Sequence, residues 1–447
     1  MKPSISKEAI ELIKNVYLAD TRPWVVGYSG GKDSTTVVQL IFYAILDLPP
    51  EKRQKPIYII SSDTLIETPL IINYIDTTLQ QIQKNADQKQ LPIKTVKVQP
   101  TLDQSFWVSL IGKGYPTPRQ KFRWCTDRLK IEPANKFILN KVSQFGEVIV
   151  VLGVRKAESA TRSQVMNIHK VEGKILRKHT TLMNAYVFAP IEDFNTDDVW
   201  RYLLQYPSPW GADNNQLLAL YQDSQAGECP LVIDNDTPSC GNSRFGCWVC
   251  TVVKEDKALM GFIESGHEYL TPLLEYRNWL QEIRDNPDFR EKKRMNGSVY
   301  FINRGDERHI GLGPFTLGAR QEMLRRLLQT EKIVGNKLIK EEELKLIRKI
   351  WLDVGDWEDT LPKIFAQVYQ RPLNWDFNER PLFTKDELQL IDQLCVDEGL
   401  DPELLRKLIN LELKHYGYKH RHGILKNMEK LLNQDWVHIN DVEGVAK

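Results

Sequence analysis

The sequence predicts an α/β protein: a parallel sheet with helices on both faces, a cysteine-rich loop module and a helical C-terminal region. Three observations predict it. Short β-branched runs alternate with longer helical patterns through the first half of the chain. Most of the cysteines gather within residues 229–250, in a stretch rich in Gly, Pro, Asn and Asp. Beyond about residue 276 the pattern is charged and helical. We therefore expect three parts, residues 1–215, 216–275 and 276–447.

Five strands are expected in the first part, and helical patterns lie between them. The strands are expected at residues 24–29, 57–63, 92–100, 147–154 and 185–193. Apolar runs rich in Val and Ile are typical of strands that are buried on both faces of a parallel sheet. Thr196 is expected to cap the helix that follows the last strand, because acidic residues come directly after it.

Composition excludes several classes of protein. The net charge of +1 gives no support for a nucleic-acid partner, which would need a local basic face. No apolar run approaches the roughly 18 residues that a membrane span requires, and residues 1–20 lack the apolar core of a signal peptide. We expect a cytoplasmic protein with no membrane partner. Six cysteines in 447 residues are too few for a disulfide scaffold, so clustered thiols indicate metal binding or redox chemistry.

The stretch WVVGYSGGKDS, residues 24–34, has the form of an anion-binding loop. A parallel strand that leads into a glycine turn and a helix places backbone N–H groups where an anion can bind. Gly30 and Gly31 permit close approach and a positive φ. Lys32, with the hydroxyls of Ser29 and Ser34, would add the further contacts that a polyphosphate needs.

Asp33 is the unexpected residue of this loop, because a Walker loop carries Ser or Thr there. A carboxylate beside bound phosphates would repel them unless a cation intervened, so Asp33 predicts Mg²⁺. The alternative is a glycine turn with a solvated Lys-Asp pair.

SGGKDS is the pyrophosphate-loop motif of the ATP pyrophosphatase and PAPS-reductase-like superfamily, which this chain resembles in further motifs. These are SSDTLIETP (61–69), RWCTDRLKIEP (123–133), GVRKAESATRS (153–163) and PIEDFNTDDVWRYL (190–203). In the last motif Phe194 and Asn195 replace the usual Trp and Thr. The resemblance implies a PP-loop ATPase fold, of the adenine nucleotide alpha-hydrolase type, and cleavage of ATP between its α and β phosphates.

The resemblance also implies which residues form the site. Catalytic roles fall on Lys32, Asp33 and Arg155. ATP and Mg²⁺ binding falls on these three and on other residues of the same motifs: Ser29, Gly30, Gly31, Ser34, Asp63, Glu158 and Arg162. The arginines are expected to contact phosphate in a bidentate manner.

A narrower resemblance carries a specific reaction. CGNSRFGCWVCTVVKEDKALMGFIESG (240–266) and GPFTLGARQEMLRRLL (313–328) are similar to the sulfurtransferases of bacterial DNA phosphorothioation. This implies ATP-dependent adenylylation of a DNA backbone phosphate with release of pyrophosphate, followed by replacement of a non-bridging oxygen by sulfur. The implied partners are DNA, a cysteine desulfurase as sulfur donor, and other subunits of the modification complex.

The cysteines indicate a metal site of one of two kinds. The C-x-x-C spacing of Cys247 and Cys250 suits zinc or an iron–sulfur cluster. Reductases of the superfamily that carry a [4Fe–4S] cluster take ligands from the R-x-C stretch and a later C-x-x-C. The resemblance therefore implies a cluster on Cys125, Cys247 and Cys250, with Cys229 as the favoured fourth ligand, because a proline follows it, and Cys240 as the alternative. A zinc site made from the four cysteines between 229 and 250 stays open.

Two basic stretches are candidates for nucleic-acid contact. The first has five cations interleaved with two aromatic residues: Arg119, Lys121, Phe122, Arg123, Trp124, Arg128 and Lys130. The second, residues 406–430, could follow DNA phosphates or form an exposed helix pair. A solvated basic loop is the alternative for the first. The three histidines of the second stretch are expected at the surface.

Other functions compete with DNA modification. A sulfonucleotide reductase would carry an E-C-G-x-H cysteine, which the sequence lacks, and Cys395 is expected to be a small buried hydrophobe in a helix. A tRNA thiolase would share the loop and the thiols. A non-enzymatic alternative is an ATP-sensing, iron–sulfur scaffold subunit, for which ATP turnover is the deciding property.

Overall fold

The computed structural model describes residues 5–158, 175–224, 246–304, 307–375 and 383–434. The chain divides into two compact units. The first contains residues 1–101 and 118–274, and the second contains residues 102–117 and 275–447. The boundaries at residues 215 and 275 that the sequence suggested remain predictions.

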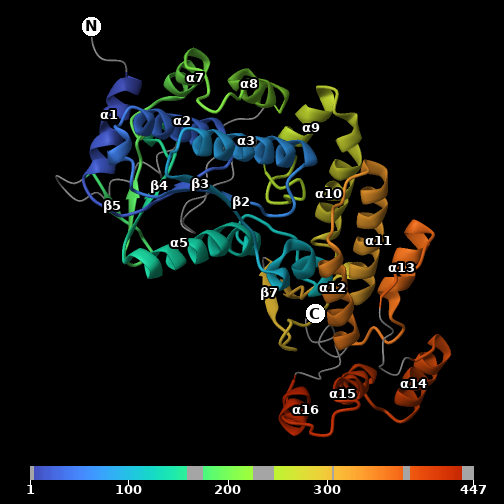
Figure 1. Ribbon diagram of the computed structural model, residues 1–447. Helices are drawn as coiled ribbons and strands as arrows, with labels where there is room; N and C mark the ends of the chain where they lie inside the picture. Colours follow the sequence, from blue (N-terminus) through green and yellow to red (C-terminus); the bar gives the residue numbers. More distant parts are fainter. Residues whose placement is uncertain (1–4, 159–174, 225–245, 305–306, 376–382, 435–447) are drawn as a thin grey trace. The chain divides into compact units, whose positions relative to one another are not determined.

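The first unit is built on a six-stranded sheet with the order β3-β2-β1-β4-β6-β5 (Figure 1). All neighbouring strands are parallel except β5, which is antiparallel to β6. The strands are β1 (Trp24–Gly27), β2 (Ile57–Ser62), β3 (Ile93–Val98), β4 (Val148–Val151), β5 (Arg177–Lys178) and β6 (Ala185–Phe188). The prediction of a mostly parallel sheet is confirmed. The strand order reverses at β1, and in parallel sheets such a switch point is where ligands bind.

Helices cover both faces of this sheet, as predicted (Figure 1). They are α1 (Ile5–Leu18), α2 (Lys32–Leu46), α3 (Pro69–Gln88), α5 (Glu132–Phe145), α7 (Thr196–Gln205) and α8 (Asn214–Asp223). The first unit also contains α4 (Trp124–Thr126) and α9 (Lys257–Glu264). Because strand side chains alternate, Trp24 and Val26 pack with α1, α2, α3, α7 and α8, whereas Val25 packs with α5 on the other face. Each face therefore has its own core.

The cap of α7 differs from the prediction. Asn195, and not Thr196, is the N-cap, and it forms a capping box with Asp198. The Asn side chain accepts a hydrogen bond from a free first-turn amide at least as well as the Thr side chain does, so the helix begins one residue earlier than predicted. Thr196 is then the first helical residue, and its hydroxyl accepts a hydrogen bond from Arg155 Nη1 at 3.4 Å.

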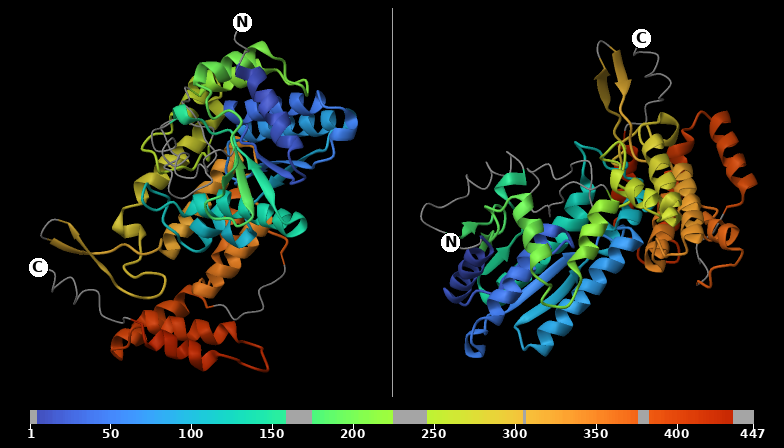
Figure 2. Two further views of the ribbon diagram at one scale, coloured as in Figure 1. Left: turned by 90° about the vertical axis from the view of Figure 1, so that its left-hand side faces the viewer. Right: turned by 90° about the horizontal axis from the view of Figure 1, so that it is seen from above.

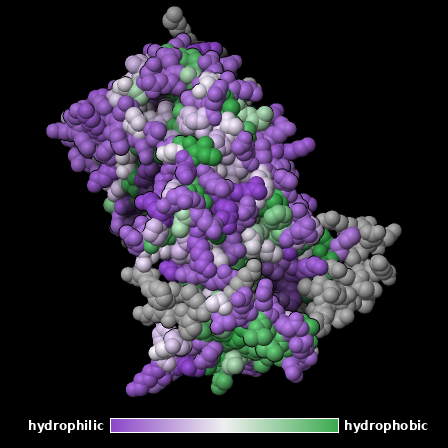
Figure 3. Space-filling view, turned by 90° about the vertical axis from the view of Figure 1, so that its right-hand side faces the viewer, coloured by the Kyte–Doolittle hydropathy of each residue, from purple (hydrophilic) through white to green (hydrophobic). Residues whose placement is uncertain are grey.

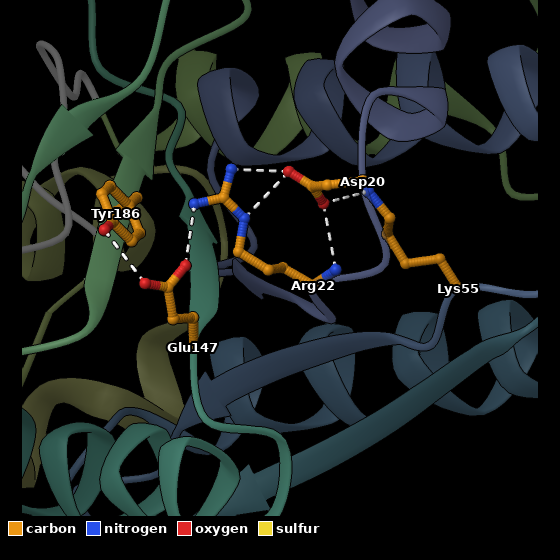
Figure 4. Close-up of polar contacts among 5 residues, drawn as sticks. All are labelled: Asp20, Arg22, Lys55, Glu147 and Tyr186. Atoms are coloured by element: carbon orange, nitrogen blue, oxygen red, sulfur yellow. Dashed lines mark hydrogen bonds and ion pairs between the residues drawn. The ribbon is translucent and has the colours of Figure 1, made fainter.

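A polar network ties together the amino ends of the strands, opposite the carboxyl edge where β1 ends (Figure 4). Arg22, just before β1, donates to Asp20 and to Glu147, which precedes β4. Tyr186 of β6 also donates to Glu147, at 3.2 Å. Lys55, before β2, donates to Asp20 at 2.9 Å and is almost fully buried. The network joins the entries to four neighbouring strands and is a structural feature.

The second unit is mostly helical, as predicted, but it also contains an unpredicted hairpin. Its helices are α10 (Thr271–Ile283, which starts in the first unit), α11 (Leu317–Val334), α12 (Glu341–Val354), α13 (Thr360–Tyr369), α14 (Lys385–Asp397), α15 (Pro402–Lys414) and α16 (Ile424–Leu432). Strands β7 (Phe301–Arg304) and β8 (Glu307–Ile310) form an antiparallel hairpin that projects from these helices (Figure 2).

Residues 102–117 are held in the second unit by tryptophan hydrogen bonds. They contain a π-helical turn, Val108–Gly112. Trp107 donates from its indole to the Leu338 carbonyl at 2.7 Å, and Trp351 donates to the Ile111 carbonyl at 2.8 Å. The C-terminal helices leave several leucines exposed, and Figure 3 shows an apolar area where they lie. In the described part of the chain, no helix has the length and apolar character to cross a membrane.

Short single turns complete the described elements. The 3₁₀ turns are Pro50–Lys52, Leu102–Gln104, Lys156–Glu158, Glu268–Leu270 and Pro287–Phe289, and a second π-helical turn spans Asp127–Ile131.

Candidate nucleotide and thiol sites

The predicted anion-binding loop lies between β1 and α2, at the switch point of the sheet. Gly30 has φ +74°, which a side chain would strain. Gly31 does not share this conformation, because its φ of −83° is extended and it serves as the N-cap of α2. A glycine cap offers no side chain to the first turn of the helix. The first-turn amides of α2 are therefore well placed for an anion.

The two loop serines are bound to one another and hold the loop closed. Their hydroxyls are 3.2 Å apart. Ser34 also accepts from the Ser29 amide and donates to the Gly31 carbonyl at 3.0 Å. In this arrangement the serines stabilise the turn itself.

Lys32, Asp33 and Arg155 form a buried charged cluster at the start of α2. Arg155 follows β4, and its Nε donates to Asp33 Oδ1 at 2.7 Å. Lys32 Nζ is 3.5 Å from Asp33 Oδ2. Lys32 is 2% exposed and Arg155 is fully buried. The three residues predicted as catalytic are thus brought together, and Asp33 links the loop to the neighbouring strand.

This cluster gives Asp33 a structural role in addition to the predicted one. The carboxylate contacts two cationic side chains, one at each oxygen, and these already balance its charge. A divalent ion at this carboxylate would compete with Arg155 and Lys32, and Asp33 as a magnesium ligand stays a prediction.

Gly153 is a site residue that the sequence reasoning did not single out. A β-carbon at this position would lie 3.0 Å from the carbonyl carbon and oxygen of Asp33 and 3.1 Å from the Ser34 amide nitrogen. The end of β4 can therefore approach the loop only because residue 153 is glycine. The signal was present in the sequence, since this glycine begins the motif that supplies Arg155.

Asp63, predicted to bind nucleotide, has protein partners at the end of β2. Its carboxylate accepts from Gln99 at 2.8 Å and lies 3.0 Å from Lys97 Nζ. Burial alone would raise the pKa of Asp63, but these two hydrogen bonds and the Leu65 amide hold it below its ordinary value. Arg162 and the side chain of Glu158, also predicted nucleotide ligands, lie outside the described residues.

Three of the predicted cluster ligands come together near the loop that follows β2. Burial raises the pKa of Cys125, and the neighbouring Cys250 and Cys247 raise it further. Burial also raises the pKa of Cys247 to about 12, against the opposing effect of Lys130. Cys125, Cys247 and Cys250, named here the thiol trio, are thus close enough to affect one another's ionisation.

The segment that carries Cys247 is attached by backbone pairing to the loop that follows β2. Cys247 forms a β-bridge with Glu67, and the Trp248 amide donates to the Ile66 carbonyl at 3.1 Å. The hydroxyl of Thr64 lies 3.5 Å from Cys247 Sγ and also donates to Glu67. Because β2 lies beside β1, the anion-binding loop and the loop with which the Cys247 segment pairs leave the same edge of adjacent strands.

The fit of the trio to a metal is partial. Among the residues that the structure describes, no three or more His, Cys, Asp or Glu side chains are arranged to hold a metal ion. Cys229 and its alternative Cys240 lie outside those residues, so the fourth predicted ligand and the choice between iron–sulfur and zinc stay predictions. Sulfur ligands nonetheless suit a [4Fe–4S] cluster, whose positive charge would stabilise buried thiolates.

The two basic stretches differ in character. In the first, Arg119, Lys121 and Phe122 are exposed, whereas Arg128 packs over Trp124 at 5.7 Å. Within residues 406–430 three of the seven cations pair with acids of their own unit: Arg406 with Asp392, Lys407 with Glu403, and Arg421 with Glu412. The exposed helix-pair alternative is thereby favoured for the second stretch. His420 and His422 are exposed, as expected, His415 is half-buried, and Cys395 is buried.

Comparison with known proteins assigns the sheet and the thiol trio to one domain. The model of the phosphoadenosine phosphosulfate reductase domain matches residues 23–253, just over half of the chain. An uncharacterized protein of Methanocaldococcus jannaschii is 28% identical over 248 residues. That match covers 56% of this chain, which spans only 40% of the relative's length.

Solved structures resemble the chain at low scores. A PAPS reductase of Candida auris gives a TM-score of 0.29 at 14% identity, covering 49% of this chain and 92% of its own. An NH3-dependent NAD synthetase of Campylobacter jejuni gives 0.30 at 12% identity, with coverages of 63% and 94%. A U34-tRNA thiolase of Methanococcus maripaludis, solved with its [4Fe–4S] cluster, gives 0.29 at 14% identity, with coverages of 63% and 81%. The family assignment accordingly depends on the domain match.

Proposed function

Because the chain belongs to the phosphoadenosine phosphosulfate reductase domain family, we propose that it is an ATP-dependent sulfurtransferase that acts on the DNA backbone. One observation carries the proposal. A loop suited to pyrophosphate and three mutually interacting thiols lie at the carboxyl edge of adjacent strands in the same unit. A nucleotide site beside sulfur ligands suits an enzyme that activates an acceptor with ATP and then adds sulfur. DNA as acceptor is supported by the resemblance to the DndC sulfurtransferases.

The reaction follows from a problem of leaving groups. A non-bridging oxygen of a phosphodiester cannot leave by itself. If that oxygen attacks the α-phosphorus of ATP, the bond between the α phosphorus and the bridging oxygen breaks and pyrophosphate departs. A thiol reductant releases hydrosulfide from the persulfide of a cysteine desulfurase and is itself oxidised to a disulfide, and the hydrosulfide then attacks the activated DNA phosphorus. AMP leaves with the original oxygen, and a phosphorothioate remains.

The chain's own groups would act on the departing pyrophosphate. Lys32 and the first-turn amides of α2 offer positive charge to it, and such positioned charge lowers the barrier to its departure. Arg155 holds Asp33 and so fixes the start of the helix. Exposed Arg119 and Lys121, with Phe122 directly after Lys121, are candidates for contact with the acceptor backbone.

The deciding experiment follows ATP labelled at the α or the γ phosphate, with DNA and sulfide present. The proposal expects AMP, pyrophosphate and DNA phosphorothioate in equal amounts. Release of ADP and inorganic phosphate contradicts it, and unchanged ATP favours the scaffold alternative. A parallel reaction with tRNA as acceptor separates the two thiolation reactions.

A cysteine series tests the thiol trio. Anaerobic purification followed by iron, sulfide and zinc analysis should show loss of iron in Cys125→Ser, Cys247→Ser and Cys250→Ser. Cys395→Ala is the matched control, because this cysteine is buried in α14 of the other unit and should leave the metal content unchanged. Bound zinc without sulfide would select the alternative site.

A further inference from the structure

The side chain of Tyr221, in α8, contacts the anion-binding loop. Its hydroxyl oxygen accepts a hydrogen bond from the Lys32 amide at 3.1 Å. Its ring lies below the Lys32 ammonium, 5.2 Å from the ring centroid. A β-carbon at Gly31 would lie 3.1 Å from the same hydroxyl, so this glycine makes room for the tyrosine. The Lys32 amide, the Lys32 ammonium and Gly31 are thus all fitted to Tyr221, which lies 189 positions after Lys32 in the chain.

The position of Tyr221 is fixed by its neighbours. It is 8% exposed and packs edge to face on Trp200 of α7, with ring centroids 5.2 Å apart. The next turn is bound to α9, since Ser265 donates to the Asp223 carbonyl at 3.3 Å. The hydroxyl is therefore presented to the loop by an ordered helix.

The amide that Tyr221 binds is one that the proposed function assigns to pyrophosphate. A buried backbone amide requires an acceptor, and in this structure a neutral hydroxyl provides it. A phosphate oxygen is a stronger acceptor because it is charged. Phosphate and tyrosine hydroxyl therefore compete for the same donor.

We propose that Tyr221 is a placeholder for a phosphate oxygen: its hydroxyl satisfies the Lys32 amide when the loop is empty and must be displaced when pyrophosphate binds. The inference rests on the proposed nucleotide site and assigns a positioning residue to it. Its consequence is that Tyr221 weakens the binding of pyrophosphate and so favours release of this product. A residue that only supported the loop would have the opposite effect when removed.

The test is calorimetric titration of inorganic pyrophosphate into the full chain and into Tyr221→Phe. Phenylalanine keeps the ring below Lys32 and removes the hydroxyl alone. Loss of one competing neutral hydrogen bond should tighten pyrophosphate binding by roughly two- to tenfold. Tyr186→Phe is the matched control, because the Tyr186 hydroxyl donates to Glu147 at the opposite edge of the sheet. This variant should bind pyrophosphate with the affinity of the unaltered chain.

Each other result overturns the inference. Equal or weaker binding by Tyr221→Phe would mean that the hydroxyl supports the ligand, and the proposed function would survive. Absence of pyrophosphate binding by every form would refute the nucleotide site and the inference together. Hydrogen exchange of the unaltered chain gives a second measurement: pyrophosphate should accelerate exchange in residues 214–223, and unchanged or slower exchange contradicts displacement.

Discussion

Replacing Arg155 by methionine should destabilise the first unit strongly. Arg155 is fully buried and binds Asp33, which is 3% exposed, at 2.7 Å. Removal of one partner from a buried ion pair leaves an uncompensated charge and costs about 3–5 kcal/mol. The nearby Lys32, 3.5 Å from the other oxygen, places the expected loss at the lower end of that range. Since one kcal/mol shifts the midpoint by about 2–4 °C for a unit of this size, the transition should fall by roughly 6–12 °C.

Differential scanning calorimetry measures this shift, and hydrogen exchange in β1 and β4 identifies the unit that melts. Arg201→Met is the control, because Arg201 is 64% exposed and its ion pair with Asp198 is long, at 4.0 Å. Such a surface pair stabilises by at most about 1 kcal/mol. Equal midpoints for Arg155→Met and Arg201→Met would refute the reasoning. A fully stable Asp33→Asn variant with a raised magnesium requirement for pyrophosphate release would restore Asp33 as a metal ligand.

Two further substitutions test the frame around the site. Gly153→Ala should cost about 1–3 kcal/mol of stability and weaken pyrophosphate binding, because the new β-carbon would meet the Asp33 backbone. Gly318→Ala in α11 is the control: no atom lies within 4 Å of its β-carbon position, so thermal unfolding should show a neutral or slightly stabilising effect. Asp20→Asn should destabilise by about 1–3 kcal/mol near neutral pH. Burial holds the pKa of Lys55 below its ordinary value, although Asp20 opposes this effect. Between the folded and the unfolded pKa of Lys55 the unfolded chain therefore binds more protons at this lysine, and the free energy of unfolding rises with pH in that range. Without Asp20 the pKa of Lys55 falls further and this rise is larger, so Asp20→Asn should cost less stability at about pH 10 than at about pH 7. Urea titrations that give the same loss at both pH values would contradict this account.

Local patterns carried most of the sheet. The runs that form β1, β2 and β4 are rich in Val and Ile, and a strand buried on both faces needs little else to be recognised. The loop at Gly30 was recognisable because a positive φ demands glycine. The hairpin β7–β8 was missed, since its residues lack the alternation of a half-buried strand and it is short.

Pairings between distant segments could not be read from the sequence. Asp33 and Arg155 are 122 residues apart, and their hydrogen bond to each other was not foreseen, although each was predicted to bind a ligand. Tyr221 carried no signal at all, because one tyrosine in a helical pattern is an ordinary core residue. Residues 102–117 were expected among the alternating helices of the sheet, but they lie in the second unit, where the indoles of Trp107 and Trp351 find carbonyl partners. Such choices depend on which polar groups meet after folding, which no local pattern records.

The carboxylate beside the loop lysine can be explained by the charges of the buried cluster. Lys32 and Arg155 are both almost wholly removed from water, and burying two cations without a counter-charge would cost several kcal/mol each. Asp33 contacts both and leaves these three side chains with one net positive charge. That remaining charge keeps the loop attractive to a polyanion, while the ion pair keeps the loop folded when no polyanion is bound. The same residue therefore serves stability in one state and permits binding in the other.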